Sequence, residues 1–341
     1  MGLNTYEDIN AVLAPISGDV IEAPGVTGTT CDNHSTYVGT DGNRHIDEVF
    51  DADLGINVFR FIIHVNEDID RDKCSTTDRQ RNEIKTYDQS PDNLLGIEGE
   101  TVQYKWKFKL DAGFQGSGSF THLHQLKAVG GSEEGTPLIT LTARENSNSR
   151  LELRYAQQAS QATETSIELS LIKGNWISVE ETVLYGETGT YNIVMTNTAT
   201  GVEIMNHTIN DRMWKTDADF VRPKWGIYRS LNSASDLRDE EVLFANFSIE
   251  ENPTLSIGDL SKETLFNASP NPTTGKVDLK LIKNINNYSV TVTDINGKTI
   301  RKTSVSDTKT VDLSDQSNGI YFFTLVDKTT NMYSVVKVLK Q

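Results

Sequence analysis

The chain has 341 residues, of which 36% are hydrophobic, and its formal net charge at pH 7 is −16. This length allows two domains with proper cores. No stretch approaches the roughly 18 consecutive apolar residues of a membrane-spanning helix, and the acidic balance argues against nucleic acid as a partner. The acidity lies before Leu265, because the residues from Leu265 onward carry a net charge of +4. An anionic ligand would therefore need a locally basic surface within an acidic body.

The N-terminal stretch MGLNTYEDINAV has neither a basic start nor an apolar block, so it lacks the features of a signal peptide. If the protein is exported, we expect this sequence to be a mature form. Cys31 and Cys74 each lie in a polar segment. A cysteine is usually an inert buried thiol, whereas export to an oxidising compartment would allow these two to form a disulfide. Their spacing fits no zinc site.

Short runs of alternating apolar and polar residues extend to residue 250, and helical periodicity is nearly absent. Turn residues separate the runs at short intervals. The runs are INVFRFIIHV, TVQYKWKFKL, SGSFTHLHQLK, PLITLTA, SRLELRYA, SIELSLI, NWISVEETVLYG, TYNIVMTN, VEIMNHTI and VLFANFSI. Many short, evenly spaced strands are typical of β-sandwiches and jelly rolls. We therefore predict an all-β jelly roll over residues 1–250.

The first of three unusually polar segments is DRQRNEIKTYD (78–88). Strand alternation places its charged and aromatic side chains on one face. These side chains are Arg79, Arg81, Glu83, Lys85 and Tyr87. A solvated outer face explains most strands of this kind, and a ligand-binding face is the alternative.

The second polar segment is SFTHLHQLKA (119–128). Alternation places His122 and His124 on one face, and Gln125 and Lys127 on the other. A strand histidine is more often structural than catalytic. Two histidines at this spacing could also bind a metal, although no third candidate ligand follows at a sequence spacing typical of a metal site.

The third polar segment is RPKWGIYRS (222–230). Lys224, Gly226 and Tyr228 alternate onto one face, and Trp225 and Ile227 onto the other. An amine, a bare backbone and a phenol are an unusual set for a half-buried strand.

A polar segment with Pro and Gly, ENPTLSIGDLSKET (251–264), predicts a linker, and a second all-β unit follows over residues 265–341. This unit contains SPNPTTG (269–275), DINGK (294–298) and NGIYFF (318–323). As a set these elements resemble the C-terminal sorting domain of the type IX secretion system of Bacteroidetes. The alternative is a small immunoglobulin-like or carbohydrate-binding module. The resemblance implies that this machinery exports the protein to the surface or surroundings of a Gram-negative bacterium.

The three polar segments together resemble the signature strands of the jelly-roll polysaccharide lyases, best known from alginate lyases of family 7. Those strands read R-S-E-L-R, Q-I-H and Y-F-K-A-G-N-Y, and here they read RNEIK, HLH and RPKWGIY. Lys85 replaces the last Arg of the first motif, and His122 stands where the second has Gln. The fuller strings DRQRNEIKTYDQSP and HLHQLK are closer to glucuronan and ulvan lyases of families 20 and 28. Between these two, the resemblance of the tail to a Bacteroidetes sorting domain favours ulvan as the substrate.

The resemblance implies β-elimination at a uronic acid, which needs a neutralised carboxylate, a base for the C5 proton and an acid for the leaving oxygen. Lyases of this fold use a Tyr as the acid and a Tyr or His as the base. Tyr228 is the first candidate and His124 the second. Arg81 and His122 are the expected carboxylate neutralisers, with a bidentate grip by Arg81. Gly226 would leave room for a sugar ring.

Further contacts with substrate carboxylate or sulfate groups are expected from Arg79, Glu83, Lys85, Gln125, Lys127, Lys224 and Arg229. Alternatives to an ulvan lyase are a glucuronan or alginate lyase and a non-catalytic, lectin-like jelly roll. A glycoside hydrolase would need paired carboxylates, and DEVFDAD (47–53) lacks their spacing. We expect a monomer that needs no cofactor for catalysis. The acidic body is compatible with a structural Ca²⁺.

Overall fold

Strands with alternating apolar residues build the N-terminal unit of the computed structural model. In β5 (Thr101–Leu110), every second side chain is buried, from Val102 to Leu110. The structure describes residues 5–16, 20–24, 44–66, 68–70, 75–145, 148–252, 265–282, 288–295, 298–305, 310–327 and 333–341. Within these ranges, no helix is both long and apolar enough to cross a membrane.

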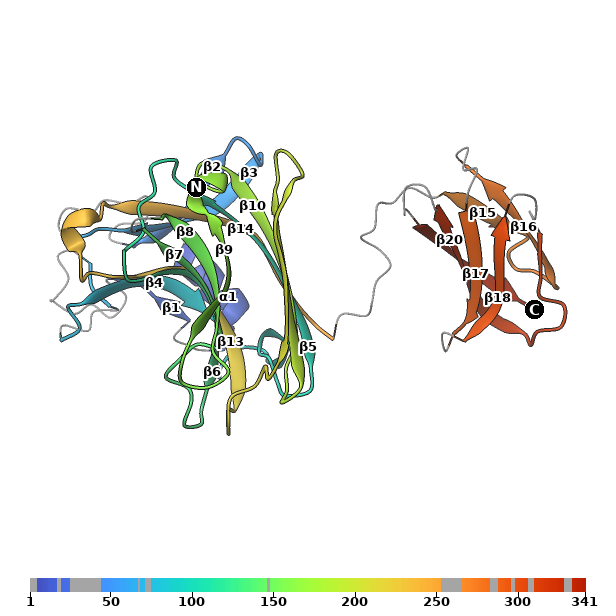
Figure 1. The fold of residues 1–341 in the computed structure, drawn as a ribbon, viewed down its shortest axis with the longest axis horizontal. Coiled ribbons are helices and arrows are strands. Elements are labelled where there is room, and N and C mark those ends of the chain that lie inside the picture. Colours follow the sequence, from blue (N-terminus) through green and yellow to red (C-terminus); the bar gives the residue numbers. More distant parts are fainter. Residues whose placement is uncertain are drawn as a thin grey trace. The chain divides into compact units, whose positions relative to one another are not determined.

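The N-terminal unit consists of two seven-stranded antiparallel sheets that face each other (Figure 1). In spatial order, the first sheet contains β1 (Ile21–Glu22), β4 (Arg79–Lys85), β13 (Phe220–Ser230), β6 (Thr121–Val129), β7 (Ile139–Arg144), β8 (Arg150–Tyr155) and β9 (Ala162–Glu168). The second contains β12 (Glu203–Asp211), β11 (Gly189–Asn197), β10 (Trp176–Leu184), β5, β14 (Glu240–Glu251), β3 (Ile56–Ile63) and β2 (Ile46–Asp51). This arrangement confirms the predicted all-β jelly roll.

The apolar core of this unit lies between the two sheets. Trp106 and Phe244 from the second sheet and Leu141 and Trp225 from the first belong to one buried cluster. Burying this much apolar surface is the main stabilising contribution to such a fold. The outer faces are therefore free to carry polar groups.

Three local elements differ from the sequence-based prediction. Residues Thr5–Leu13 form helix α1, in which Tyr6 and Ile9 are buried at a helical spacing that is too short to stand out in the sequence. The segment Ile46–Asp51, considered above only as a failed hydrolase motif, is strand β2. The run SIELSLI ends β9 and continues as a short 3₁₀ helix, Leu169–Leu171.

The C-terminal unit has its own two antiparallel sheets. One contains β15 (Phe266–Ser269), β16 (Lys276–Leu281) and β19 (Thr310–Asp312), and the other contains β18 (Thr299–Val305), β17 (Tyr288–Asp294), β20 (Gly319–Asp327) and β21 (Tyr333–Lys340). Phe266, Val292 and Phe323 are fully buried in a core that shares no residue with that of the N-terminal unit. This confirms the predicted small β-sandwich.

The division into two units falls between Pro253 and Thr254, inside the segment 251–264 that we predict to be a linker. Strand β14 continues to Glu251, one residue beyond the predicted end of the first domain. Cys31 and Cys74 lie outside the described residues, so their disulfide stays a prediction.

Candidate functional site

The outer surface of β4, β13 and β6 carries a concentrated set of polar side chains, which we call the polar face. Its members are Arg79, Arg81, Glu83, Lys85, His122, Gln125, Lys127, Arg222, Lys224 and Tyr228. The strands are adjacent, with β13 in the middle. Strand register pairs Tyr228 directly with Arg81 on one side and with His122 on the other. Three side chains that are far apart in the sequence are thus direct neighbours.

Tyr228 lies at the centre of this group and is only 9% exposed. The Arg81 guanidinium carbon lies 3.7 Å from the centre of its ring, and Arg79 Nη1 donates a hydrogen bond of 3.1 Å to its hydroxyl oxygen. The His122 ring centre is 5.7 Å from that of Tyr228, and Phe120 packs against both rings. Because the hydroxyl oxygen accepts from Arg79, its own proton remains available to a ligand.

His122 is held by a hydrogen bond between Nδ1 and Thr142 Oγ1, 2.8 Å apart. Among the described residues, its Nε2 has no hydrogen-bond partner. Burial lowers the His122 pKa to about 3; the negative charge of Glu83 raises it in part, and the positive charge of Arg81 lowers it further. His122 is therefore a neutral imidazole at neutral pH, with one nitrogen available to a ligand.

Ion pairs connect much of the polar face. Arg81 donates from Nε to Asp70 (2.8 Å) and from Nη1 to both Glu22 (3.0 Å) and Glu83 (2.9 Å). Burial opposes its charge, but these carboxylates raise the pKa of Arg81 above its usual range. The expected bidentate grip of Arg81 on substrate is thus not available, because protein carboxylates occupy Nε and Nη1. Only Nη2 is left for a ligand.

Lys224 and Lys85 belong to the same network. Lys224 contacts Glu22 and lies 2.7 Å from Glu83, and Lys85 lies 3.0 Å from Glu22. Burial would raise the pKa of Glu83, but the charges of Lys224 and Arg81 outweigh it and lower the pKa. Gln125 donates to the other oxygen of Glu83. The charges and hydrogen-bonding groups of these side chains are paired with one another, so we assign to this network the role of positioning Arg81.

Lys127 and Arg222 are different, because no described carboxylate pairs with either of them. They are direct partners in the pairing of β6 with β13. Arg222 lies over the Tyr87 ring at 4.6 Å, and its Nε and Nη1 are buried without a hydrogen-bond partner among the described residues. Burial and nearby cations lower the Lys127 pKa to about 8. Two uncompensated cations side by side are suited to an anionic ligand.

His124 does not lie on the polar face, so the prediction that it shares a face with His122 is wrong. The register of β6 with β7 shifts between His122 and His124, which leaves Leu123 as an extra, bulged residue. His124 is fully buried between the sheets, packs between Trp106 and Trp225, and has Nε2 3.2 Å from Glu181. The same shift places His122 on the face of Lys127.

Two further residues correct the sequence-based interpretation. Arg229 is fully buried on the opposite face, where it donates to the Gln80 side chain and the Arg238 carbonyl, so it is no contact of the polar face. Gly226 does not make room for a sugar ring. Its φ is +146°, and a Cβ there would lie 2.1 Å from the Asn82 carbonyl oxygen of β4. The glycine instead allows the two strands to approach.

Arg222, Glu22 and Asp70 belong to the site but were not predicted from the sequence. Arg222 could have been found, because it precedes Lys224 by two residues and therefore shares its face. Glu22 and Asp70 lie in β1 and a loop, and nothing in their local sequence links them to Arg81.

Comparison with known protein families gives one match, and it is confined to the C-terminal unit. Residues 267–340 match the family described as "Secretion system C-terminal sorting domain". This match supports export of the protein to the cell surface or the medium. A comparison with curated protein sequences found no match.

Comparison with solved structures gives alginate and glucuronan lyases of low similarity. An endo-β-1,4-glucuronan lyase from the fungus Trichoderma reesei is 15% identical, with a TM-score of 0.44, over 64% of this chain and 93% of that one. An alginate lyase from Klebsiella pneumoniae is 9% identical, with a TM-score of 0.46, over 67% and 93%. One from Pseudomonas aeruginosa is 13% identical, with a TM-score of 0.40, over 60% and 85%. Similarities this weak show nothing about the activity of this chain.

Proposed function

We propose that the N-terminal unit is a lyase that cleaves a uronate-containing polysaccharide by β-elimination. The observation that carries this proposal is the direct pairing of Tyr228 with His122 across adjacent strands. The pair offers a phenol with a free proton beside a neutral imidazole with a free nitrogen. One acid and one base at adjacent positions are what a β-elimination requires.

In the proposed reaction, His122 Nε2 removes the proton from C5 of the uronate, and the electron pair forms the C4–C5 double bond. The bond from C4 to the glycosidic oxygen breaks, and Tyr228 donates its proton to that oxygen. Arg79, which already donates to the Tyr228 oxygen, stabilises the phenolate that remains. A bound substrate carboxylate would add negative charge beside His122 and raise its pKa towards the range of a useful base.

The substrate carboxylate must be neutralised before C5–H becomes acidic. Arg81 Nη2 is the candidate for this contact, because the other donors of the guanidinium are occupied. The network of Glu22, Asp70 and Glu83 holds Arg81 in place. Such preorganisation stabilises developing negative charge without rearrangement during the reaction.

A polymeric, multiply charged substrate fits the extent of the polar face. Arg222 and Tyr228 lie six residues apart on β13, or about 20 Å at 3.3 Å per residue. The unpaired Lys127 and Arg222 would bind a second anionic group of the same chain, a carboxylate or a sulfate. Any uronate polymer supplies such groups, so our preference for a sulfated polymer of the ulvan type over glucuronan and alginate rests on the sequence resemblance and the sorting tail.

The sorting-domain match supports the proposal that the type IX machinery exports the protein, which would place it where such polymers occur. An exported monomer without a catalytic cofactor remains our expectation, as does a structural Ca²⁺.

A panel of ulvan, desulfated ulvan, glucuronan and alginate tests the proposal. Each polymer is incubated with the full chain, and the unsaturated uronate product is followed by its ultraviolet absorbance. We expect product from ulvan and less from desulfated ulvan. Product from all uronates alike would overturn the sulfate preference. Binding to a polymer without any product would support the lectin-like alternative instead.

A further inference from the structure

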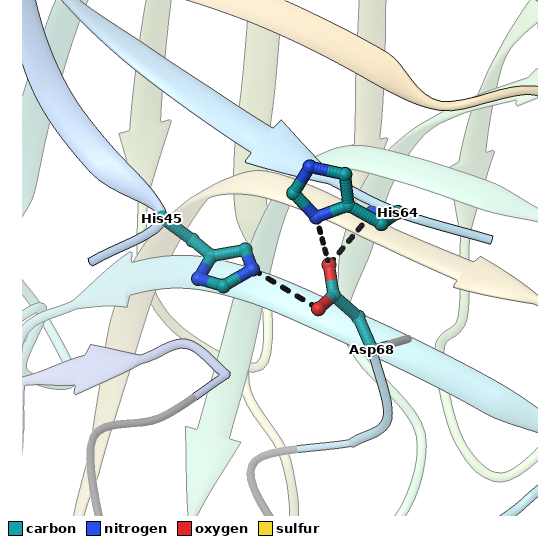
Figure 2. Close-up of side chains that lie close together, drawn as sticks. All are labelled: His45, His64 and Asp68. Atoms are coloured by element: carbon teal, nitrogen blue, oxygen red, sulfur yellow. Dashed lines mark hydrogen bonds and ion pairs between the residues drawn. The ribbon is translucent and has the colours of Figure 1, made fainter. Parts of the chain in front are cut away.

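Two histidines and an aspartate converge away from the polar face. His45 directly precedes β2, His64 directly follows β3, and Asp68 lies in the loop that leads towards β4. The Asp68 carboxylate lies between the two imidazoles (Figure 2). Its Oδ1 is 3.0 Å from His45 Nε2, and its Oδ2 is 3.2 Å from His64 Nδ1.

We propose that His45, His64 and Asp68 bind a divalent transition metal, with Zn²⁺ the best match. One ligand atom of each residue can be chosen so that all three lie within 4.8 Å of one another. In a tetrahedral site with bonds of about 2.0–2.1 Å, neighbouring ligand atoms are about 3.3 Å apart. The two contacts within the group, made by different oxygens of Asp68, are already close to this spacing, and rotations of the side chains would bring one oxygen and both nitrogens around an ion.

The donor set selects the kind of metal. Two imidazole nitrogens and one carboxylate oxygen suit Zn²⁺ and related ions. Ca²⁺ prefers six to eight oxygen ligands, so this group is not the structural calcium site that the acidic composition allows. Three protein ligands leave the fourth position to a water molecule or another donor.

Hydrogen bonds hold the backbone of the proposed ligands in place. The Gln80 amide donates to the carbonyl oxygens of His64 (2.8 Å) and Asp68 (3.0 Å), and the Asn82 amide donates to that of His45 (2.8 Å). The backbone N–H of His64 donates to Asp68 Oδ2 at 2.6 Å. Both amides extend from the inner face of β4, so one strand fixes all three ligands. A site supported in this way needs little rearrangement to bind.

A metal ion could reach the group through His64. The side chains of His45 and Asp68 are each 1% exposed, whereas that of His64 is 15% exposed. His64 lines a cavity of about 310 Å³ together with four acidic residues and one arginine. These residues are Asp111, Asp239, Glu240, Glu241 and Arg238. An acidic entrance raises the local concentration of cations.

The proposed role of the metal is structural. Asp70 follows Asp68 by two residues and pairs with Arg81 at 2.8 Å. A metal that ties Asp68 to the ends of two strands would also fix the position of Asp70, and through it Arg81. The alternative is a metal-free cluster in which Asp68 accepts hydrogen bonds from both imidazoles.

Metal binding by the full chain distinguishes these possibilities without any activity assay. The protein is stripped with a chelator, titrated with Zn²⁺ or Co²⁺, freed of excess ion and analysed for bound metal. We expect one ion per chain, intense visible absorption bands with Co²⁺, and a melting temperature that rises by a few degrees with Zn²⁺. Asp68→Asn and His64→Ala should each reduce the affinity by about 10-fold or more.

His207→Ala is the matched control, because His207 lies on β12 with a carboxylate, Glu164, at 3.9 Å and belongs to no such group in the described part of the chain. This variant should bind metal like the wild type. Wild-type protein that takes up no Zn²⁺ or Co²⁺ would overturn the proposal, whatever the variants do. Undiminished binding by a folded Asp68→Asn variant would overturn it as well. Metal binding is measured without a substrate, so a wild-type protein that is inactive on every polymer would contradict the proposed lyase function but not the proposed metal site.

Discussion

Tyr228 has two guanidinium groups as neighbours, one at its oxygen and one over its ring. This environment explains why a strand that packs Trp225 and Ile227 into the core carries a phenol on its other side. The residue types of the site could be predicted, because alternation separates Lys224 and Tyr228 from the apolar residues between them. Their ion-pair partners could not, because Glu22 and Asp70 are brought to Arg81 only by tertiary structure.

Replacing Tyr228 by Phe tests the proposed acid. The variant keeps the ring contacts with Arg81 and Phe120 and removes the donor to the leaving oxygen. Activity should fall by about 10²–10⁴-fold, the usual scale of general acid–base assistance. The free energy of unfolding should change by only about 1 kcal/mol, because one hydrogen bond with Arg79 is lost.

Initial rates on the best polymer and a denaturant titration provide the two measurements. Tyr87→Phe is the matched control, because Tyr87 also lies beneath cations but its hydroxyl has no role in the proposed reaction. A Tyr228→Phe enzyme that keeps more than about a third of the wild-type rate, far above the expected loss, would rule out this mechanism.

The two histidines of β6 should respond in opposite ways to replacement by alanine. His122→Ala should reduce activity by about 10²-fold or more and leave stability almost unchanged. His124→Ala should destabilise the protein by about 3 kcal/mol or more, because it leaves a cavity between Trp106 and Trp225 and removes one of the partners of the buried Glu181. Rates and unfolding curves of both variants separate the roles. If His124→Ala is as stable as the wild type yet less active than His122→Ala, the proposed base is wrong.

At the scale of elements, the sequence predicts strands better than it predicts their pairing. The run TVQYKWKFKL coincides with β5, because uninterrupted alternation leaves no ambiguity about which side is buried. The bulge in β6 has no such signal, since Leu123 and His124 look like an ordinary alternating pair. The register of β6 with β13, which puts Lys127 beside Arg222, also depends on partners far away in the chain.

The pairing of Lys127 with Arg222 predicts a pH dependence of substrate binding. Lys127 is charged below its pKa of about 8 and loses its proton as the pH rises through that value. The KM for an anionic polymer should therefore increase by about 5- to 50-fold when the charge is lost, which corresponds to roughly 1–2 kcal/mol. The kcat should change little, because Lys127 lies five residues from His122.

Steady-state kinetics on either side of that pKa check this expectation in three enzymes. Lys127→Arg should keep a constant KM, because a guanidinium stays charged over the whole range. Lys127→Met should show a high KM at every pH. An unchanged wild-type KM, or the same pH response in Lys127→Arg, would show that another group titrates.

At the scale of the whole molecule, two separate cores divide the chain into parts of different charge and task. The polar face belongs entirely to the N-terminal unit, and the sorting-domain match entirely to the C-terminal one. Composition alone indicates this division, because the net charge changes from −20 before Leu265 to +4 after it.

A fragment of residues 1–255 should therefore fold and keep the full lyase activity, since, among the residues that the structure describes, the core of this unit contains none from the C-terminal unit. In the native host, loss of residues 265–341 should abolish export. Circular dichroism, initial rates and fractionation of the culture check the three outcomes. A folded fragment that has lost most of its activity would show that the C-terminal unit takes part in binding or catalysis.

The bulge at Leu123 also affects how this strand should be aligned with others. Residues before it and after it follow opposite phases of the strand, so removing Leu123 would restore regular alternation, with His122 still outward and His124 still inward. A signature motif with one histidine can be matched to either residue by identity alone. The position of the bulge, which follows His122, decides that this histidine and not His124 stands beside Tyr228.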